Sequence, residues 1–94
     1  MRAKRTDANQ KQIMDALRKI PQLTVFSTHT IGKGFPDIIV GYKNVNYMFE
    51  IKDGNKVASA QKLTEDEVKF HAEWKGQINI AKNLDDILKI VLSL

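Results

Sequence analysis

The spacing of apolar and polar positions along the chain predicts three helices and four strands. An apolar stripe at helical spacing runs through the first segment, at Gln10, Ile13, Met14 and Leu17. Residues 37–42 form a continuous apolar run between turn signals, which is typical of a buried strand. The expected helices cover 7–20, 64–75 and 84–94, and the expected strands cover 23–29, 37–42, 47–52 and 78–81. This αβββαβα order predicts an α/β domain with helices flanking a small mixed sheet.

Local signals define the ends of these helices. Pro21 follows the first helix and ends it. Thr64 and Glu67 have the spacing of a capping box, and Gly76 stops the helix that they begin. Asn83 caps the last helix, which is apolar almost all round. Because such a helix is usually buried on more than one side, we expect a subunit interface there and a homodimer.

Composition narrows the class of protein. The chain has 94 residues, 43% of them hydrophobic, which suits one domain, 1–94, with a single modest core. Cysteine is absent and histidine occurs twice, so disulfide scaffolds and cysteine- or histidine-ligated zinc are not expected. No apolar run approaches the roughly 18 residues of a membrane span, and the N-terminus lacks the apolar core of a secretory signal. We therefore expect a cytoplasmic protein without a membrane partner.

Two acidic residues and one lysine are the candidates for chemistry. Glu50 and Lys52 are two apart on a predicted strand and share a face. A four-residue hairpin loop over 43–46 would set Asp37 opposite Lys52 and Ile39 opposite Glu50, on that same face. The alternative is a solvated ion pair on an edge strand. Buried, such a cluster is costly unless it is paired or metal-bound, which favours a functional site.

The residue types suit phosphodiester hydrolysis. Two carboxylates are ligands that Mg²⁺ or Mn²⁺ prefers, and a bound metal would acidify a water and orient the scissile phosphate. Lys52 would position the nucleophile and stabilise the charge of the transition state. A net charge of +4 agrees with a polyanionic substrate such as nucleic acid.

The motifs resemble those of a nuclease superfamily. The run Gly34-Phe35-Pro36-Asp37, followed on the next strand by Glu50-Ile51-Lys52, resembles the PD-(D/E)XK signature. Three further runs, DANQ at 7–10, EIKDG at 50–54 and KLTEDEVKFH at 62–71, make about residues 6–92 similar to the stand-alone VRR-NUC (virus-type replication-repair nuclease) domain. The resemblance implies a restriction-endonuclease-like core.

The resemblance also implies a function. Asp37, Glu50 and the backbone carbonyl of Ile51 would bind Mg²⁺, with Mn²⁺ able to substitute, and Lys52 would be the catalytic lysine. The expected activity is structure-specific cleavage of branched DNA by a Holliday-junction-resolvase-like homodimer in DNA repair, in a bacterial or phage-infected cell. The alternatives are a flap or other DNA nuclease, or a nucleic-acid-binding module that no longer cleaves.

Two positions depart from the family pattern. Where the family often has a glutamate on the first helix, this chain offers Asp7, Asn9 and Gln10, of which Gln10 should face inward beside the metal site. Where the family commonly has a glutamine on the helix after the hairpin, this chain has Glu67, which either serves the site or caps the helix.

The remaining predictions concern the contacts with DNA. Lys33, Lys56 and Lys62 are the candidate phosphate contacts, and residues 1–5 are predicted to form a flexible basic arm. Trp74 continues the stripe of Glu67 and is expected in the core, not as a base-stacking platform.

Overall fold

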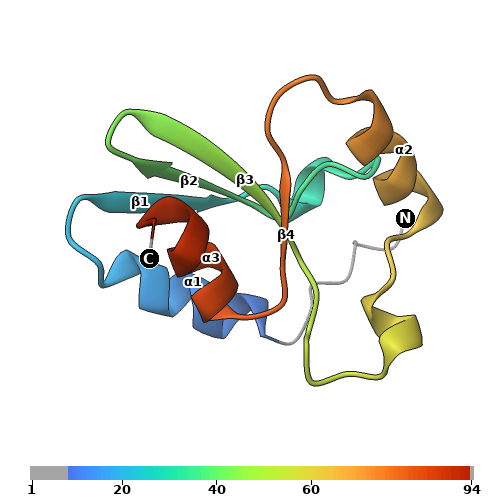
Figure 1. The fold of residues 1–94 in the computed structure, drawn as a ribbon, viewed down its shortest axis with the longest axis horizontal. Helices are drawn as coiled ribbons and strands as arrows, with labels where there is room; N and C mark the ends of the chain where they lie inside the picture. The colour runs from blue at the N-terminus through green and yellow to red at the C-terminus, as the bar shows by residue number, and fades with distance from the viewer. Residues whose placement is uncertain (1–8, 94) are drawn as a thin grey trace.

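The computed structural model describes residues 9–93, which form an α/β fold of one mixed sheet and three helices (Figure 1). The elements are α1 (Gln10–Arg18), β1 (Leu23–Ser27), β2 (Ile38–Tyr42), β3 (Val45–Ile51), α2 (Glu65–Glu73), β4 (Asn79–Ala81) and α3 (Leu84–Val91), with short 3₁₀ turns at His29–Ile31 and Ala58–Gln61. The predicted αβββαβα order is confirmed. Asp7, Leu94 and the proposed basic arm lie outside the described residues.

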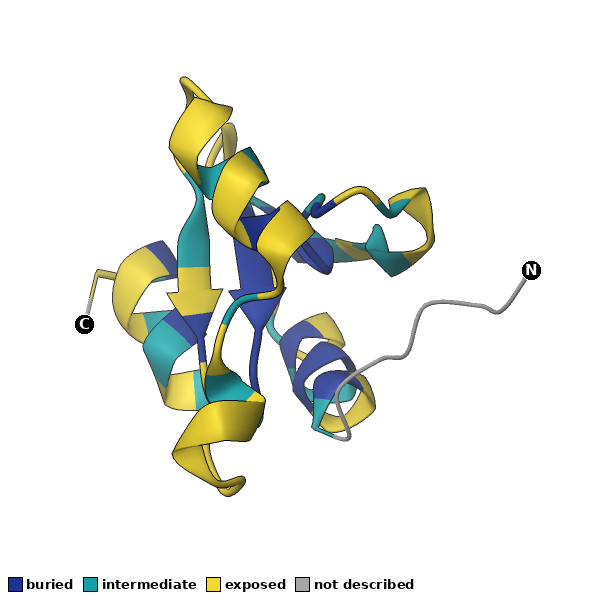
Figure 2. Cartoon of the chain, turned by 90° about the vertical axis from the view of Figure 1, so that its right-hand side faces the viewer, coloured by how far each residue is buried: buried dark blue, intermediate teal, exposed yellow. Residues whose placement is uncertain are grey.

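The sheet carries helices α1 and α3 on one face. Its strand order is β1-β2-β3-β4, with β1 to β3 antiparallel and β4 parallel to β3. In Figure 1, α1 and α3 lie together below the sheet, while α2 stands beyond its right-hand end. The core between these helices and the sheet contains Ile13, Met14, Leu17, Ile38, Val40, Phe49, Ile51, Ile87 and Val91. Figure 2 shows the buried residues along the strands and on α1, whereas α2 is mostly exposed.

The turn between β2 and β3 is shorter than predicted. Tyr42 pairs with Val45, so Lys43 and Asn44 alone form the turn, in place of a loop over 43–46. Both turn residues have positive φ, 51° and 65°. Two positive φ angles are the mark of a type I′ turn, whose twist matches that of the flanking strands. The two-residue turn is therefore favoured over the predicted loop of four residues.

The shorter turn shifts the register of the hairpin by two residues. Ile39 lies opposite Met48 and not, as predicted, opposite Glu50. The same shift moves Asp37 from the predicted position opposite Lys52. Because side chains alternate with a period of two, a shift of two residues leaves each one on the predicted face.

The helix α2 begins as predicted but ends early. Thr64 is its N-cap, and the predicted capping box with Glu67 is confirmed. The helix ends at Glu73, and the next residue, Trp74, has an extended backbone with ψ of 128°. The expectation that Trp74 lies in the core is wrong, since its side chain sits at the end of the helix and is 42% exposed.

Other element ends also fall short of their predictions. The strand β1 ends at Ser27 and is followed by the 3₁₀ turn His29–Ile31, and α3 ends at Val91. Asn83 caps α3 by accepting the Asp86 N–H at 2.9 Å, as predicted. The helix buries one side only, because Ile90 is 38% exposed. No helix within residues 9–93 has the length and apolar character to cross a membrane.

Candidate active site

A glycine-rich loop leads into the segment that carries Asp37. Within it, Gly34 has a φ of 79°, in the region that favours glycine. A Cβ at Gly34 would lie 2.2 Å from the carbonyl oxygen of Asp66, in the first turn of α2. The backbone of the loop therefore packs directly against the helix that supplies Glu67.

Asp37 is held by the main chain of β3. Its backbone N–H donates to the carbonyl of Phe49 at 2.9 Å, and its Oδ2 accepts the N–H of Ile51 at 2.8 Å. Its own carbonyl accepts the N–H of Thr28 at 2.8 Å. The side chain is buried, so these bonds fix the carboxylate against the strand that carries Glu50.

The side chains of Glu50, near the end of strand β3, and of Lys52, just after it, lie close to the side chain of Glu67 in α2. The Lys52 Nζ donates to Glu67 Oε1 at 2.8 Å and lies 3.9 Å from Glu50 Oε2. Relative exposures are 1% for Glu50, 7% for Lys52 and 3% for Glu67. Asp37 is also buried, and its carboxyl group is close enough to Glu50 to raise the pKa of that residue. The predicted group of Asp37, Glu50 and Lys52 is therefore brought together, and Glu67 joins it.

Glu67 contacts the site and caps the helix with one oxygen. The Oε1 that accepts from Lys52 also accepts the backbone N–H of Thr64 at 2.9 Å. In return, Thr64 Oγ1 accepts the N–H of Glu67 at 3.2 Å. The two alternatives that the sequence left open for Glu67 are therefore both realised in its contacts.

The surroundings of Glu50 and Glu67 shift the pKa values of these two residues in opposite directions. Desolvation, reinforced by the carboxyl groups of Asp37 and Glu67, raises the pKa of Glu50 to about 10. Burial acts in the same direction on Glu67, but the hydrogen bonds from Lys52 and Thr64 outweigh it and hold the pKa of Glu67 at about 2. Neighbouring carboxyl groups with divergent pKa values are typical of catalytic sites.

Glu67 should contribute to stability in a pH-dependent way. Its lowered pKa means that its contribution is complete above about pH 4.5 and is lost as the pH falls toward 2. The change Glu67→Gln should lower the free energy of unfolding at neutral pH by about 1–3 kcal/mol, because Lys52 loses its charged partner. Urea denaturation at neutral and acidic pH measures this. Glu65→Gln, on the exposed side of the same turn, should change it by less than about 0.5 kcal/mol. Equal losses in both variants would contradict the assignment.

At the start of α1, Asn9 is hydrogen-bonded to the end of β3, whereas Gln10 contacts Met14 of its own helix. Gln10 faces inward as predicted and is buried, and its Oε1 accepts no hydrogen bond. Asn9, which the sequence offered beside Gln10 at this turn, donates from its Nδ2 to the carbonyls of Lys52 at 3.4 Å and Lys82 at 3.2 Å. Asn9 thereby connects the start of α1 to the end of β3. The only sequence signal for this contact was the position of Asn9 at the start of the helix.

The oxygens of this cluster suit a hard divalent cation. Glu50 Oε1 is buried and accepts no hydrogen bond, like Gln10 Oε1. Within residues 9–93 no three His, Cys, Asp or Glu side chains are arranged around one point as a ligand set. A cation would therefore need the two carboxylates of Asp37 and Glu50 together with carbonyl or amide oxygens, which is the donor type that Mg²⁺ prefers.

The three lysines predicted to contact DNA are exposed. Lys33 lies in the glycine loop and lines a cavity of about 350 Å³ together with Thr64 and Glu67. Lys56 and Lys62 lie on either side of the 3₁₀ turn that follows β3. Lys33 thus lies beside Glu67 of the cluster.

Comparison with family models, curated proteins and solved structures gives no match to this chain. The likeness to the VRR-NUC domain therefore rests on the sequence motifs, and the α/β fold is established by its own elements.

Proposed function

We propose that this protein is a divalent-metal-dependent DNA endonuclease with a PD-(D/E)XK-type site. The observation that carries the proposal is the burial of Asp37, Glu50 and Lys52 together with Glu67 in one cluster. Three acids against one lysine is an excess of negative charge that a buried site tolerates only by protonation or by binding a cation. A fold does not require such a cluster, whereas metal-dependent phosphodiester hydrolysis does.

Each residue has a role in the proposed reaction. Asp37 and Glu50, with the Ile51 carbonyl, would hold Mg²⁺ or Mn²⁺, which supplies charge neutralisation at the phosphate and an acidified water. Glu50 must be deprotonated to bind a cation, so cation binding would release a proton from the protein. The Lys52 ammonium has only donors, and one of them is fixed on Glu67. We therefore assign Lys52 to stabilising the negative charge on the phosphate and orienting the attacking water.

Branched DNA is the proposed substrate, with a homodimer as the acting form. A two-fold dimer would present two sites to two strands of a junction, which symmetric cleavage requires. The partly exposed α3, with Ile90 at 38%, is the surface proposed for the dimer. A flap nuclease is the closest alternative, and a binding module without catalysis is the other.

Lys52→Ala tests the proposal. Cleavage of a labelled four-way junction, a flap and a plain duplex is measured with Mg²⁺, Mn²⁺ or EDTA. We expect metal-dependent nicking of the junction, reduced by about 10²–10⁴-fold in Lys52→Ala because the charge that meets the transition state is gone. Lys19→Ala, an exposed lysine at the end of α1 to which the proposal gives no role, is the matched control and should cleave like the wild type.

The outcomes separate the alternatives. Preferred cleavage of the flap would support the proposed active site but would show that a flap, and not a junction, is the substrate. Binding of DNA without cleavage, unchanged by Lys52→Ala, would replace the enzyme by a binding module.

A further inference from the structure

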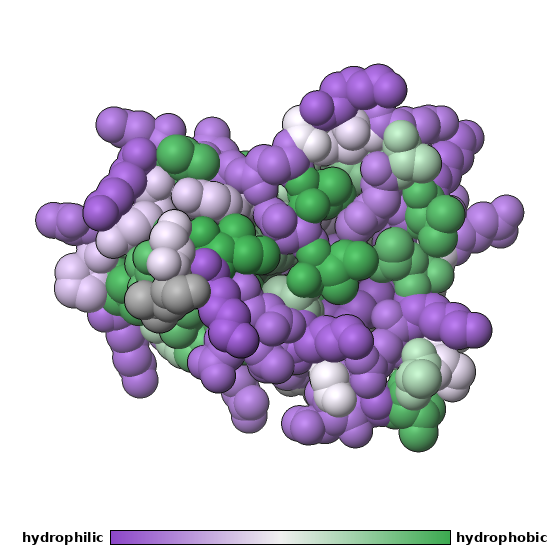
Figure 3. All heavy atoms as spheres, in the orientation of Figure 1, coloured by the Kyte–Doolittle hydropathy of each residue, from purple (hydrophilic) through white to green (hydrophobic). Residues whose placement is uncertain are grey.

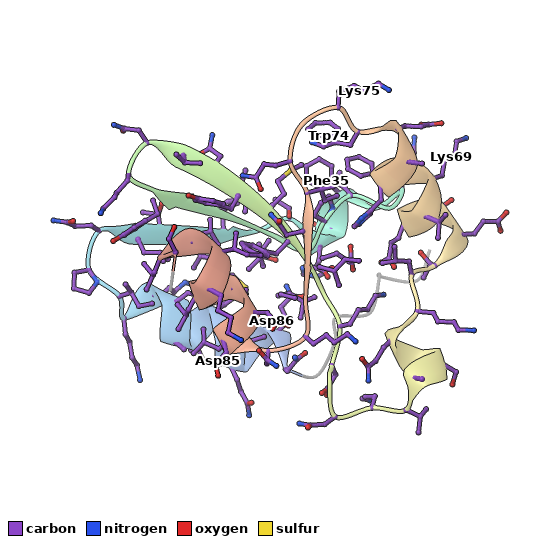
Figure 4. The ribbon with its side chains drawn as sticks, viewed as in Figure 1. Phe35, Lys69, Trp74, Lys75, Asp85 and Asp86 are labelled. Carbon is purple, nitrogen blue, oxygen red and sulfur yellow. The ribbon has the colours of Figure 1, made fainter. Side chains whose placement is uncertain are left out.

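Three aromatic side chains form a continuous stack beside the candidate active site. The ring centroids of Phe70 and Trp74 are 5.1 Å apart with an interplanar angle of 18°, so these two rings are stacked. Phe35 meets both edge-on, at 5.3 Å from Phe70 and 6.4 Å from Trp74. Figure 4 shows Phe35 and Trp74 next to each other between the sheet and α2. Trp74 ends the stack and is 42% exposed as a residue, and the backbone of Gly76 lies against the Nε1 edge of its indole.

The stack is rigidly connected to the candidate catalytic residues. Phe35 is two residues before Asp37, and Phe70 follows Glu67 by one helical turn. Gly34 packs on the first turn of α2, which fixes the loop that carries Phe35 against the helix. An exposed ring held in this way is pre-organised, because little side-chain freedom is left to lose when a ligand covers it.

We propose that Trp74 is a stacking platform for an unpaired base of the DNA strand that is held at the candidate active site. The inference rests on the proposed function and adds to it a single-stranded segment as part of the substrate. Every base has a π-face, so stacking on an indole is tolerant of sequence, as expected for an enzyme that recognises DNA structure.

The size of the exposed area favours a base over a second copy of the chain. An aromatic side chain presents about 150–250 Å² when fully accessible, so 42% of the indole is on the order of 100 Å². A stable protein interface buries about 800 Å² on each partner. Figure 3 shows that the hydrophobic side chains beside α2 are set among hydrophilic ones. An exposed area of about 100 Å² suits one base, not a broad interface.

The charges around the platform are mixed. Lys69 and Lys75 are exposed on either side of Trp74 in sequence and are available to phosphates (Figure 4). Glu73, also exposed, opposes them. Stacking, and not charge, should therefore supply most of the affinity at this position, and the platform should depend little on salt.

Trp74 is the only tryptophan of the chain, so its fluorescence reports on this position alone. The wild-type protein is titrated in EDTA with an oligothymidylate of about ten nucleotides, and with an abasic oligomer of the same length and charge. We expect quenching of the emission by the oligothymidylate, none by the abasic oligomer, and about tenfold tighter binding of the former.

Variants confirm the origin of the signal. In Trp74→Leu, polarisation of a labelled oligothymidylate should show binding about tenfold weaker, with an unchanged slope against salt, because the phosphate contacts remain. Val68→Ala, an exposed apolar residue of the same helix, is the control and should bind like the wild type. Circular dichroism establishes that both variants are folded.

Two results would overturn the platform. One is equal binding of the two oligomers by the wild type. The other is an emission that changes with protein concentration and not with DNA, which would assign Trp74 to a contact between copies. Because EDTA prevents cleavage, either result leaves the nuclease proposal to its own assay, and a failure of that assay leaves the fluorescence result intact.

Discussion

Replacing Glu50 by glutamine should abolish DNA cleavage and, at the same time, make the metal-free protein more stable. Cleavage should fall by on the order of 10³-fold or more, because the amide that replaces the carboxylate is a poor ligand for Mg²⁺. Stability should rise because Glu50 is buried between Asp37 and Glu67 with one oxygen that accepts no hydrogen bond. A side chain that cannot ionise avoids this cost, by about 1–4 kcal/mol.

The gain in stability should grow with pH. The pKa of Glu50 is raised in the folded protein, so the wild type loses stability as the pH rises from about 4.5 toward 10, while the unfolded chain releases this proton. The Glu50→Gln variant does not lose stability in this way, because glutamine does not ionise. In EDTA, the difference between the two unfolding free energies should therefore be small at about pH 5 and exceed about 1 kcal/mol at about pH 8.5.

Chemical denaturation at the two pH values, beside a cleavage assay, measures both effects. Glu73→Gln, an exposed glutamate of α2, is the control and should change neither stability nor cleavage. A Glu50→Gln protein that is less stable than the wild type at about pH 8.5 would contradict the raised pKa assigned to this buried carboxyl group.

Gly34→Ala should cause the largest loss of stability of any substitution considered for this chain, about 3–5 kcal/mol. A Cβ at this position lies 2.2 Å from the Asp66 carbonyl oxygen and 2.9 Å from the Glu67 nitrogen, and the φ of 79° is unfavourable for alanine. Backbone atoms cannot move aside as a flexible side chain would, so the loop must separate from α2.

A neighbouring glycine supplies the matched control. Gly32 has nearly the same φ, 75°, but a Cβ there meets no atom within 4 Å. Gly32→Ala should therefore cost only the backbone strain, about 1–3 kcal/mol. Urea or thermal unfolding of the two variants measures the difference. Equal losses would show that the contact between loop and helix contributes nothing.

The sequence was sufficient to predict the order of the elements and the face on which the candidate residues gather. Both follow from the period of the apolar pattern, which is local, and the face of a strand survives a shift of two residues. The convergence of Asp37, Glu50 and Lys52 could be predicted for that reason. Gln10 was predicted to face inward on the same grounds.

What was missed depends on tertiary contacts or on the last residue of an element. The length of the hairpin turn was wrong because Lys43 and Asn44 adopt positive φ without any glycine to signal it. The stripe of Glu67 places Trp74 in the core only if the helix continues past Glu73, where it ends. The double contact of Glu67 could not be derived, since it needs the distance between the end of β3 and α2.

The most direct test of the central claim is a time course of cleavage of a labelled four-way junction by the wild-type protein in excess DNA, with Mg²⁺ or with EDTA, beside Glu50→Gln prepared in the same way. We predict repeated turnover with Mg²⁺, none with EDTA, and none in the variant. Cleavage that persists in EDTA, or that Glu50→Gln retains, would show that the buried cluster of Asp37, Glu50 and Lys52 is not a metal-dependent catalytic site.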